Sequence, residues 1–540
     1  MNNINRRRFL QSAFYSSLLY GAGSLPNVVS NTGAMPQPLN SRVLANLYLN
    51  GGPDMRHLIV PAFDATPNSY GNEYWKNRYR SHQLTSNQST WQARWENDYY
   101  PITVGGQNWN GGLVDSNGLN NQVTFGIWRE AGWLIDMFRA GNVALIFNAV
   151  GGTNRAHDLS TLMLEQGNLF STLSQSTRSG WGGRLARSAG GNSVSLISSP
   201  RPFTFGPVGA APNYNPNAID NIDLLSVENA REIGLYDFDI ENSQLGNRDE
   251  TMARAAKSYY AGLRQERIAR VYTKFLDHES TIRQFGEAIQ ERLGSVPTPL
   301  LISALRNQEA GINLDPNDND PRRVLRSTGF ARQISNLYDL LVSSDLVPAS
   351  VMSMEYGGWD SHGDQRRGVS ASTADPNNPN ISRGIENGLK DIFGGQFGSN
   401  PSDSAALHSG FSALWASLPS ATDRQKIVLT IAGEFGRQIR DNGDAGTDHG
   451  KGNLMFVIGE QCRGGVYGQI FPNEEIERYQ DLSQRTPDID PRTDIDTFYA
   501  QVCNFIQPGS GSVVFPRTAN GFSGEAPRIE RVGMFNNLFS

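Results

Sequence analysis

Short runs of β-branched and apolar residues alternate along the chain with stretches that carry apolar residues at helical spacing. Such runs, each bounded by glycine or polar residues, predict strands at 42–50, 143–150, 349–356, 426–433 and 454–458. Helical spacing occurs at 127–140 and 159–166, on either side of the second run. Alternation of this kind is typical of α/β proteins. We therefore expect a mainly parallel central sheet flanked by helices.

Two segments interrupt this alternation. Residues 64–122 are rich in Asn, Gly, Trp and Tyr without a sustained period, which predicts a long loop excursion. Residues 200–325 begin as a loop rich in Pro and Asn and continue with helical spacing at 248–292, which predicts a largely helical insertion or cap. Both are interpreted as insertions into one domain spanning 35–540.

The composition excludes several classes of protein. Of 540 residues, 38% are hydrophobic and 19% are charged, and the net charge is −6, so the chain has neither a disordered composition nor a basic field that would attract nucleic acid. Cys462 and Cys503 are the two cysteines. A disulfide scaffold and a cysteine-rich zinc site are therefore excluded, and at most one disulfide can form.

Residues 1–34 have the pattern of an export signal. The sequence Arg6-Arg7-Arg8-Phe9-Leu10 precedes a short, weakly apolar stretch that resembles a twin-arginine signal peptide. No apolar run of the chain is long enough for a transmembrane span. We expect a periplasmic or secreted protein that is exported folded by the twin-arginine translocase.

Residues able to bind metal or transfer protons follow four of the predicted strands. In chain order, they are Asp54, His157, Asp360 with His362, and Glu434. Because ligands of open α/β sheets bind at the carboxyl ends of the strands, these side chains are predicted to converge. A glycine-rich loop adds Asp448 and His449. Carboxylates with neutral imidazoles suit one or two divalent ions, such as zinc, manganese or iron.

Each candidate also has a purely structural interpretation. Asp54 could close a turn, His157 could start a helix, and Asp360 could pair with His362. Glu434 could form a salt bridge with Arg437 or Arg440. The remaining histidines lack the combined context of carboxylates and glycines that marks the candidates and are interpreted as structural or surface groups: His57, His82, His278 and His408.

Two arginines near predicted strand ends are candidates for binding an anion. Arg155 and Arg437 carry guanidinium groups, which grip phosphate or sulfate oxygens in a bidentate manner. With His157, they form the predicted catalytic group, beside a predicted metal group of Asp54, Asp360, His362, Glu434, Asp448 and His449.

Several motifs occur in a fixed order along the chain: Asn50-Gly-Gly-Pro-Asp54, Arg155-Ala-His157 through Glu165-Gln-Gly167, Gly180-Trp-Gly-Gly-Arg184, Gly358-Trp-Asp-Ser-His362-Gly-Asp-Gln365, Glu434-Phe-Gly-Arg437 and Gly446-Thr-Asp-His-Gly450. Together with the twin-arginine start, they resemble the domain-of-unknown-function family 1501. Similarity places that family in the alkaline phosphatase and sulfatase superfamily. The resemblance implies an alkaline phosphatase-like sandwich with a site for one or two divalent metals.

The resemblance carries over by position, with two departures. Asp54, Asp360, His362 and His449 match metal ligands of the superfamily, and Glu434 stands where an Asp is usual. Phe435 replaces the His that normally follows it. His157 occupies the place of the Ser, Thr or Cys nucleophile.

The departure at the nucleophile position leaves three alternatives: attack by a metal-bound hydroxide, a ligand role for His157, or loss of hydrolysis. The leading hypothesis is an exported metal-dependent hydrolase acting on a small phosphate or sulfate ester, including a carbohydrate-linked one. The alternative is a non-catalytic envelope or secreted binding or assembly protein that retains the fold.

Overall fold

The computed structural model describes residues 41–105, 123–221, 223–230, 288–294, 298–309, 325, 327–366, 384–395, 409–468, 470–471, 473–481, 483, 488, 491, 493–516 and 535–539. The predicted export signal and almost all of the predicted long helix at 248–292 lie outside these residues. Within the described part of the chain, no helix is long and apolar enough to cross a membrane.

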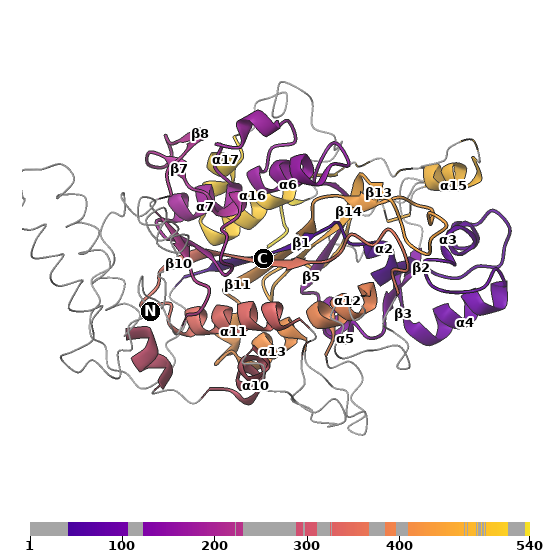
Figure 1. The fold of residues 1–540 in the computed structure, drawn as a ribbon, viewed down its shortest axis with the longest axis horizontal. Helices are drawn as coiled ribbons and strands as arrows, with labels where there is room; N and C mark the ends of the chain where they lie inside the picture. The colour runs from indigo at the N-terminus through magenta and orange to yellow at the C-terminus, as the bar shows by residue number, and fades with distance from the viewer. Residues whose placement is uncertain are drawn as a thin grey trace, which may run out of the picture.

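A nine-stranded sheet forms the centre of the molecule (Figure 1). Its order is β15 (Gly465–Tyr467), β5 (Val143–Val150), β14 (Gly452–Ile458), β11 (Ile427–Gly433), β1 (Val43–Asn50), β10 (Ala349–Gly357), β6 (Asn192–Ser195) and β9 (Leu224–Ser226), with β16 (Thr493–Asp494) also paired to β5. Only β14 pairs in the antiparallel sense with its described neighbours. The expected α/β class with a mostly parallel sheet is confirmed.

Helices cover both faces of this sheet (Figure 1). One layer contains α6 (His157–Gln166), α7 (Trp181–Ala189), α16 (Ile495–Ile506) and α17 (Ser510–Val514). The other contains α5 (Gly132–Arg139), α10 (Leu300–Glu309), α11 (Thr328–Val342), α12 (Ile385–Phe393) and α13 (Gly410–Ser417). The short α14 (Ala421–Arg424) precedes β11.

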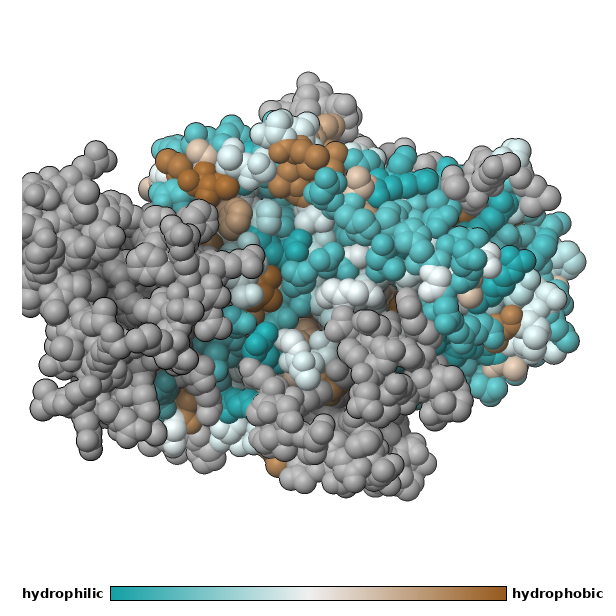
Figure 2. All heavy atoms as spheres, in the orientation of Figure 1, coloured by the Kyte–Doolittle hydropathy of each residue, from teal (hydrophilic) through white to brown (hydrophobic). Residues whose placement is uncertain are grey.

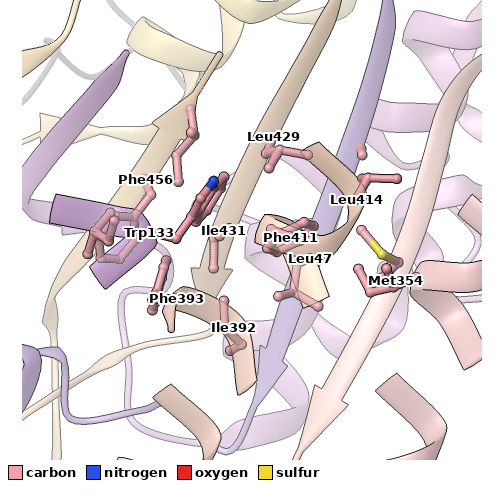
Figure 3. Packing of buried hydrophobic residues seen from close by; sticks show 14 of the residues in the cluster. Leu47, Trp133, Met354, Ile392, Phe393, Phe411, Leu414, Leu429, Ile431 and Phe456 are labelled. Atoms are coloured by element: carbon pink, nitrogen blue, oxygen red, sulfur yellow. The ribbon is translucent and has the colours of Figure 1, made fainter. Parts of the chain in front are cut away.

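Alternation along β1 divides the hydrophobic core between the two layers. Leu47 and Leu49 belong to one buried cluster, whereas Leu44 and Tyr48 belong to the other. Figure 3 shows how strand side chains such as Leu47 and Phe456 face residues of α5, α12 and α13. Burying each large side chain contributes about 1.5–3 kcal/mol, so the sheet is held from both faces.

The prediction of a loop excursion at 64–122 was wrong for its first part. Residues 64–105 contain α3 (Tyr70–Arg78), α4 (Gln88–Asp98) and β3 (Tyr99–Val104), and residues 106–122 lie outside the described part. Ser69 and Asn87 cap the two helices, whose hydrophobic residues do not follow a clear helical period. β3 joins β2 (Ile59–Pro61) and β4 (Val123–Trp128) in a small antiparallel sheet, and α2 (Met55–Leu58) lies beside it.

Three other expectations can be compared with the structure. The helix predicted at 127–140 begins later, at Gly132, because Ile127 and Trp128 pair with β3. In 200–325, the described residues before 230 form the short strands β7 (Pro207–Val208), β8 (Asn215–Ile219) and β9, whereas 288–294 and α10 are helical, so only the later described part agrees with the prediction. Cys462 and Cys503 are both buried and unbonded, so no disulfide forms.

Hydrophilic residues cover most of the visible surface over α3, α4 and α15 (Asn473–Gln480), as Figure 2 shows. Large exposed apolar side chains occur singly at Leu173, Val208 and Leu300 among the described residues. Isolated apolar residues of this kind are ordinary for a protein surface.

Gly436 allows two segments to cross closely beside the strand ends. It starts β12 (Gly436–Arg437), which pairs with β13 (His449–Gly450), and a Cβ atom at Gly436 would lie 1.7 Å from the carbonyl oxygen of Gly452.

We expect Gly436→Ala to lower the free energy of unfolding by about 1–3 kcal/mol, measured by urea denaturation. Gly329→Ala is the matched control, because nothing lies within 4 Å of its added Cβ and helical Ala is favoured over Gly. Equal stability of the Gly436→Ala variant and the native chain would contradict this packing.

Candidate metal centre

Segments from four strands meet at one edge of the sheet. β5, β10 and β11 are parallel and end there, leading to His157, Asp360 and Glu434. β14 runs the other way, so its amino end lies at the same edge and is preceded by His449. Strand direction therefore brings residues that precede one strand beside residues that follow the others.

Four of the predicted residues converge in an exposed cluster, here called the Asp360 cluster: His157, Asp360, His362 and His449. Asp360 Oδ1 lies 2.9 Å from His449 Nε2 and 3.0 Å from His362 Nε2, and Asp360 Oδ2 lies 3.5 Å from His157 Nε2. Donor atoms of His157, Asp360 and His449 all lie within 4.8 Å of one another. A carboxylate with imidazoles in this arrangement could hold a divalent ion.

The second nitrogen of each histidine is bonded outside the cluster. His157 Nδ1 lies 2.7 Å from Glu434 Oε1, and His449 Nδ1 donates to the carbonyl oxygen of Arg155 at 2.9 Å. His362 Nδ1 lies 3.0 Å from Asp448 Oδ1. These contacts set the orientation of each ring and direct its Nε2 toward Asp360, which is how proteins position metal-binding histidines.

The protonation states favour ligand binding. Partial burial opposes ionisation of Asp360, but its contact with His449 and the hydrogen bond from Arg437 lower its pKa to about 2. Burial lowers the pKa of His449 despite its contact with Asp360. Near neutral pH, Asp360 is therefore a carboxylate and His449 a neutral imidazole, which are the forms that coordinate metal.

Glu434 lies behind His157 rather than beside Asp360. Its side chain is fully buried, and its carboxylate accepts hydrogen bonds from the backbone amides of Gly51 and Gly52 at 3.0–3.3 Å. The remaining contact is with His157 Nδ1. The structure thus gives Glu434 the geometry of a residue that positions His157.

The two predicted anion-binding arginines are already paired. Arg437 is buried and donates to backbone carbonyl oxygens, including those of Gly52 at 2.6 Å and Thr447 at 2.8 Å, and to Asp360 Oδ1 at 2.9 Å. Arg155 lies at the surface, and its Nη2 donates to Asp488 Oδ2 at 2.8 Å. Arg437 therefore joins the loops that carry the cluster, and only Arg155 has a substantially exposed side chain.

Asp54 is not brought to the cluster. It is buried, with Arg78 Nη2 2.6 Å from its Oδ1 and Gln365 Nε2 3.1 Å from its Oδ2. Burial opposes its ionisation, but Arg78 lowers the pKa of Asp54 below the ordinary value. The Asp54 carboxylate is thus engaged by Arg78 and Gln365 and is not part of the Asp360 cluster.

Asp54 adjoins a buried polar network that the sequence analysis did not anticipate. His57 and His82 stack with ring centroids 4.3 Å apart, and His57 Nε2 lies 2.8 Å from Glu386 Oε1. Arg94 and Arg366 also donate to Glu386.

The exposed cluster is supported by two further polar contacts, which run from Asn442 to Asp448 and to the carbonyl oxygen of His362. Neither set has a sequence signal, because the partners lie far apart in the chain.

Arg437→Lys tests whether the buried guanidinium joins the strand-end loops. A single ammonium group cannot replace a planar fork that bonds several carbonyls, so we expect a loss of about 3 kcal/mol or more in urea denaturation. Arg139→Lys, at the exposed end of α5, should change stability by less than about 0.5 kcal/mol. If both variants are as stable as the native chain, Arg437 does not have this role.

Glu386→Gln tests the buried network through its pH dependence. Burial opposes ionisation, but the hydrogen bond from His57 and the charges of Arg94 and Arg366 hold the pKa of Glu386 well below its usual range. The contribution of ionised Glu386 to the free energy of unfolding should be complete above its unfolded-state pKa near 4.5. It should be lost as pH falls toward the folded-state pKa.

At pH 7, we expect Glu386→Gln to cost about 3–5 kcal/mol, because the buried Arg94 and the partly buried Arg366 lose their carboxylate partner. The variant should also show a shallower loss of stability than the native chain between about pH 5 and 3 in urea denaturation. The exposed Glu96→Gln is the matched control and should follow the native curve. Parallel curves for the native chain and Glu386→Gln would rule out this contribution.

Comparisons with known proteins give one match. No curated protein and no solved structure matches the chain. Residues 347–473 match the model of a family described as "Protein of unknown function (DUF1501)". The matched segment includes Asp360, His362, Glu434 and His449, so this part of the chain, which supplies most of the cluster, supports the resemblance to the DUF1501 family.

Proposed function

We propose that the protein is an exported metal-dependent hydrolase of the alkaline phosphatase and sulfatase type, acting on a phosphate or sulfate ester. The observation that carries the proposal is the convergence of His157 Nε2, His449 Nε2 and an Asp360 oxygen within 4.8 Å, with the other nitrogen of each histidine bonded elsewhere. Because hydrogen bonds at Nδ1 fix the orientation of both imidazole rings, the arrangement supports coordination of a metal ion rather than a chance surface contact.

The donor set fits zinc, manganese or iron. An Asp360 oxygen lies 2.9 Å from His449 Nε2 and another lies 3.5 Å from His157 Nε2, and the donor atoms of the three residues lie within 4.8 Å of one another, close enough for one ion to contact all three. His157, Asp360 and His449 would hold one ion, and His362 with Asp448 could contribute to a second.

A bound divalent ion would lower the pKa of water and polarise the ester oxygens. In the protein, Glu434 holds His157 in one orientation, and Arg437 holds Asp360 ionised in place. Substrate anion would reach the cluster from the solvent side, where His157, Asp360 and His362 are each more than 40% exposed. Arg155 could bind that anion by exchanging its contact with Asp488.

A water nucleophile agrees better with the surroundings than a seryl intermediate does. Ser160 is buried and its hydroxyl bonds to Asn154, while the Thr161 hydroxyl lies 2.6 Å from Tyr48 Oη. Both hydroxyl groups of α6 are thus engaged away from Asp360.

The twin-arginine pattern of residues 1–34 supports a further part of the proposal, namely that the folded, metal-loaded protein is exported to the periplasm or secreted.

Metal analysis tests this proposal directly. After native export and purification without chelators, we expect about one or two zinc, manganese or iron ions per chain by elemental mass spectrometry, with hydrolysis of 4-nitrophenyl phosphate or sulfate. His449→Ala and Asp360→Asn should retain the fold but lose most of the metal and the turnover. Glu434→Gln should weaken metal binding about 10–100-fold, because His157 loses its charged partner.

Asp158→Asn is the matched control, since Asp158 is exposed and adjacent to His157 but bonds only to the start of α6. It should bind metal like the native chain. Folded native protein that takes up none of the three metals, or equal metal content in His449→Ala, would refute the proposal.

A further inference from the structure

A cavity of about 650 Å³ lies beside the carboxyl end of β10. Its walls come from three segments: the loop 197–202, the first turns of α11 and residues 355–358. This volume is in the range of small-molecule sites, which commonly occur at the carboxyl ends of strands in α/β proteins. The cavity, called the β10 pocket below, was not anticipated by the sequence analysis.

The β10 pocket and the Asp360 cluster share a continuous piece of chain. Gly358 lines the pocket, and Asp360 follows two residues later. Two residues of fully extended chain span at most about 7 Å, so the Cα atoms of these residues cannot be farther apart than that. A molecule with its reacting group at Asp360 therefore has this pocket within reach of its remaining part.

Helix α6 also connects the two sites. His157, Thr161 and Glu165 are spaced at four-residue intervals and lie on one face of the helix. His157 contacts the cluster, Thr161 contacts Tyr48, and Glu165 forms an ion pair with Arg201 in the pocket wall. The same helix and the same strand thus set the positions of both sites.

The pocket wall carries charge but little net positive charge. Arg201 Nη1 donates to Glu355 Oε2 at 2.9 Å, its Nε donates to Glu165, and its guanidinium lies 3.9 Å from the ring centre of Tyr48. Burial raises the pKa of Glu165 to about 7 despite the opposing charge of Arg201. Because carboxylates compensate Arg201, the pocket is poorly suited to a second phosphate or sulfate group.

The wall instead presents donors and acceptors side by side with apolar surfaces. Arg201 supplies N–H donors, Glu355 supplies carboxylate acceptors, and the exposed Ser199 supplies a hydroxyl that does both. Pro200, Pro202 and Tyr356 add ring surfaces. A cyclic polyol matches such a wall, because each of its hydroxyl groups can donate and accept a hydrogen bond and its carbon ring can pack against the apolar surfaces.

We propose that the β10 pocket binds the uncharged, polyhydroxyl part of the ester whose anionic group reacts at the Asp360 cluster. The substrate class is then a phosphate or sulfate ester of a sugar or cyclic polyol. This assignment of substrate class rests on the proposed hydrolase function, whereas binding of a neutral polyol in the pocket can be measured without turnover.

The test is ligand-observed NMR with neutral probes: the methyl glycosides of glucose, galactose, mannose and xylose, and myo-inositol. At least one should bind the full chain with millimolar affinity, a range set by a few hydrogen bonds to a solvated ligand. Ser199→Trp should weaken this binding about tenfold or more by filling the pocket from its exposed rim. This variant avoids removing Arg201, which would leave Glu165 buried and uncompensated.

Ser86→Trp is the matched control, because Ser86 is exposed ahead of α4 and does not line the pocket. It should bind the probe like the native chain, and so should His449→Ala, which lacks the metal site. Binding of none of the probes, or equal binding by Ser199→Trp, would overturn the inference. Polyol binding that persists while metal and hydrolysis are absent would instead refute only the hydrolase proposal.

Discussion

The geometry of the strand-end loops depends on one buried cation. The Arg437 guanidinium donates to the carbonyl oxygens of Gly51, Gly52, Trp359 and Thr447 and to the Asp360 carboxylate. These groups come from three loops far apart in the sequence. Removing an ion from water is unfavourable, and burial lowers the pKa of Arg437 although Asp360 opposes the change. The several hydrogen bonds offset this penalty and hold the loops at fixed distances.

A second layer of contacts turns that frame into an oriented site. Glu434 accepts from the amides of Gly51 and Gly52 and contacts His157, so the first loop and α6 are tied to the end of β11. The carbonyl oxygen of Arg155 accepts a hydrogen bond from His449 Nδ1 and thereby ties His449 to the segment that precedes α6. Because the partner behind His157 is buried and the one behind His449 belongs to the backbone, the Nε2 atoms of these two rings are oriented before any ligand arrives.

Burial separates two groups of polar residues that look alike in the sequence. Asp54 and His57 are buried in the protein interior beside arginines and Glu386, and each charge has a partner. Asp360 and His362 have more than 40% of their side chains exposed and can reach a ligand. The first group stabilises the region between β1 and α12, and the second group is available for chemistry.

Local pattern was sufficient to predict the main strands and the candidate residues at their ends. Runs of apolar residues bounded by glycine mark buried strands, and this signal needs only neighbours in the sequence. The runs at 143–150 and 349–356 accordingly coincide with β5 and β10 to within a residue. The convergence of His157 with Asp360 also follows from sequence, because parallel strands end at one edge.

Tertiary structure decided the rest. No local pattern specifies that β14 is antiparallel, yet this direction places His449 beside Asp360. Nor does the sequence show that Arg78 forms an ion pair with Asp54, or that Glu434 contacts the Nδ1 side of the His157 ring. In both cases the partner comes from another segment of the chain. The sequence by itself thus determined which residues lie near the sheet edge. Long-range pairing and burial decided which of them face solvent, because both depend on contacts between segments remote in the chain.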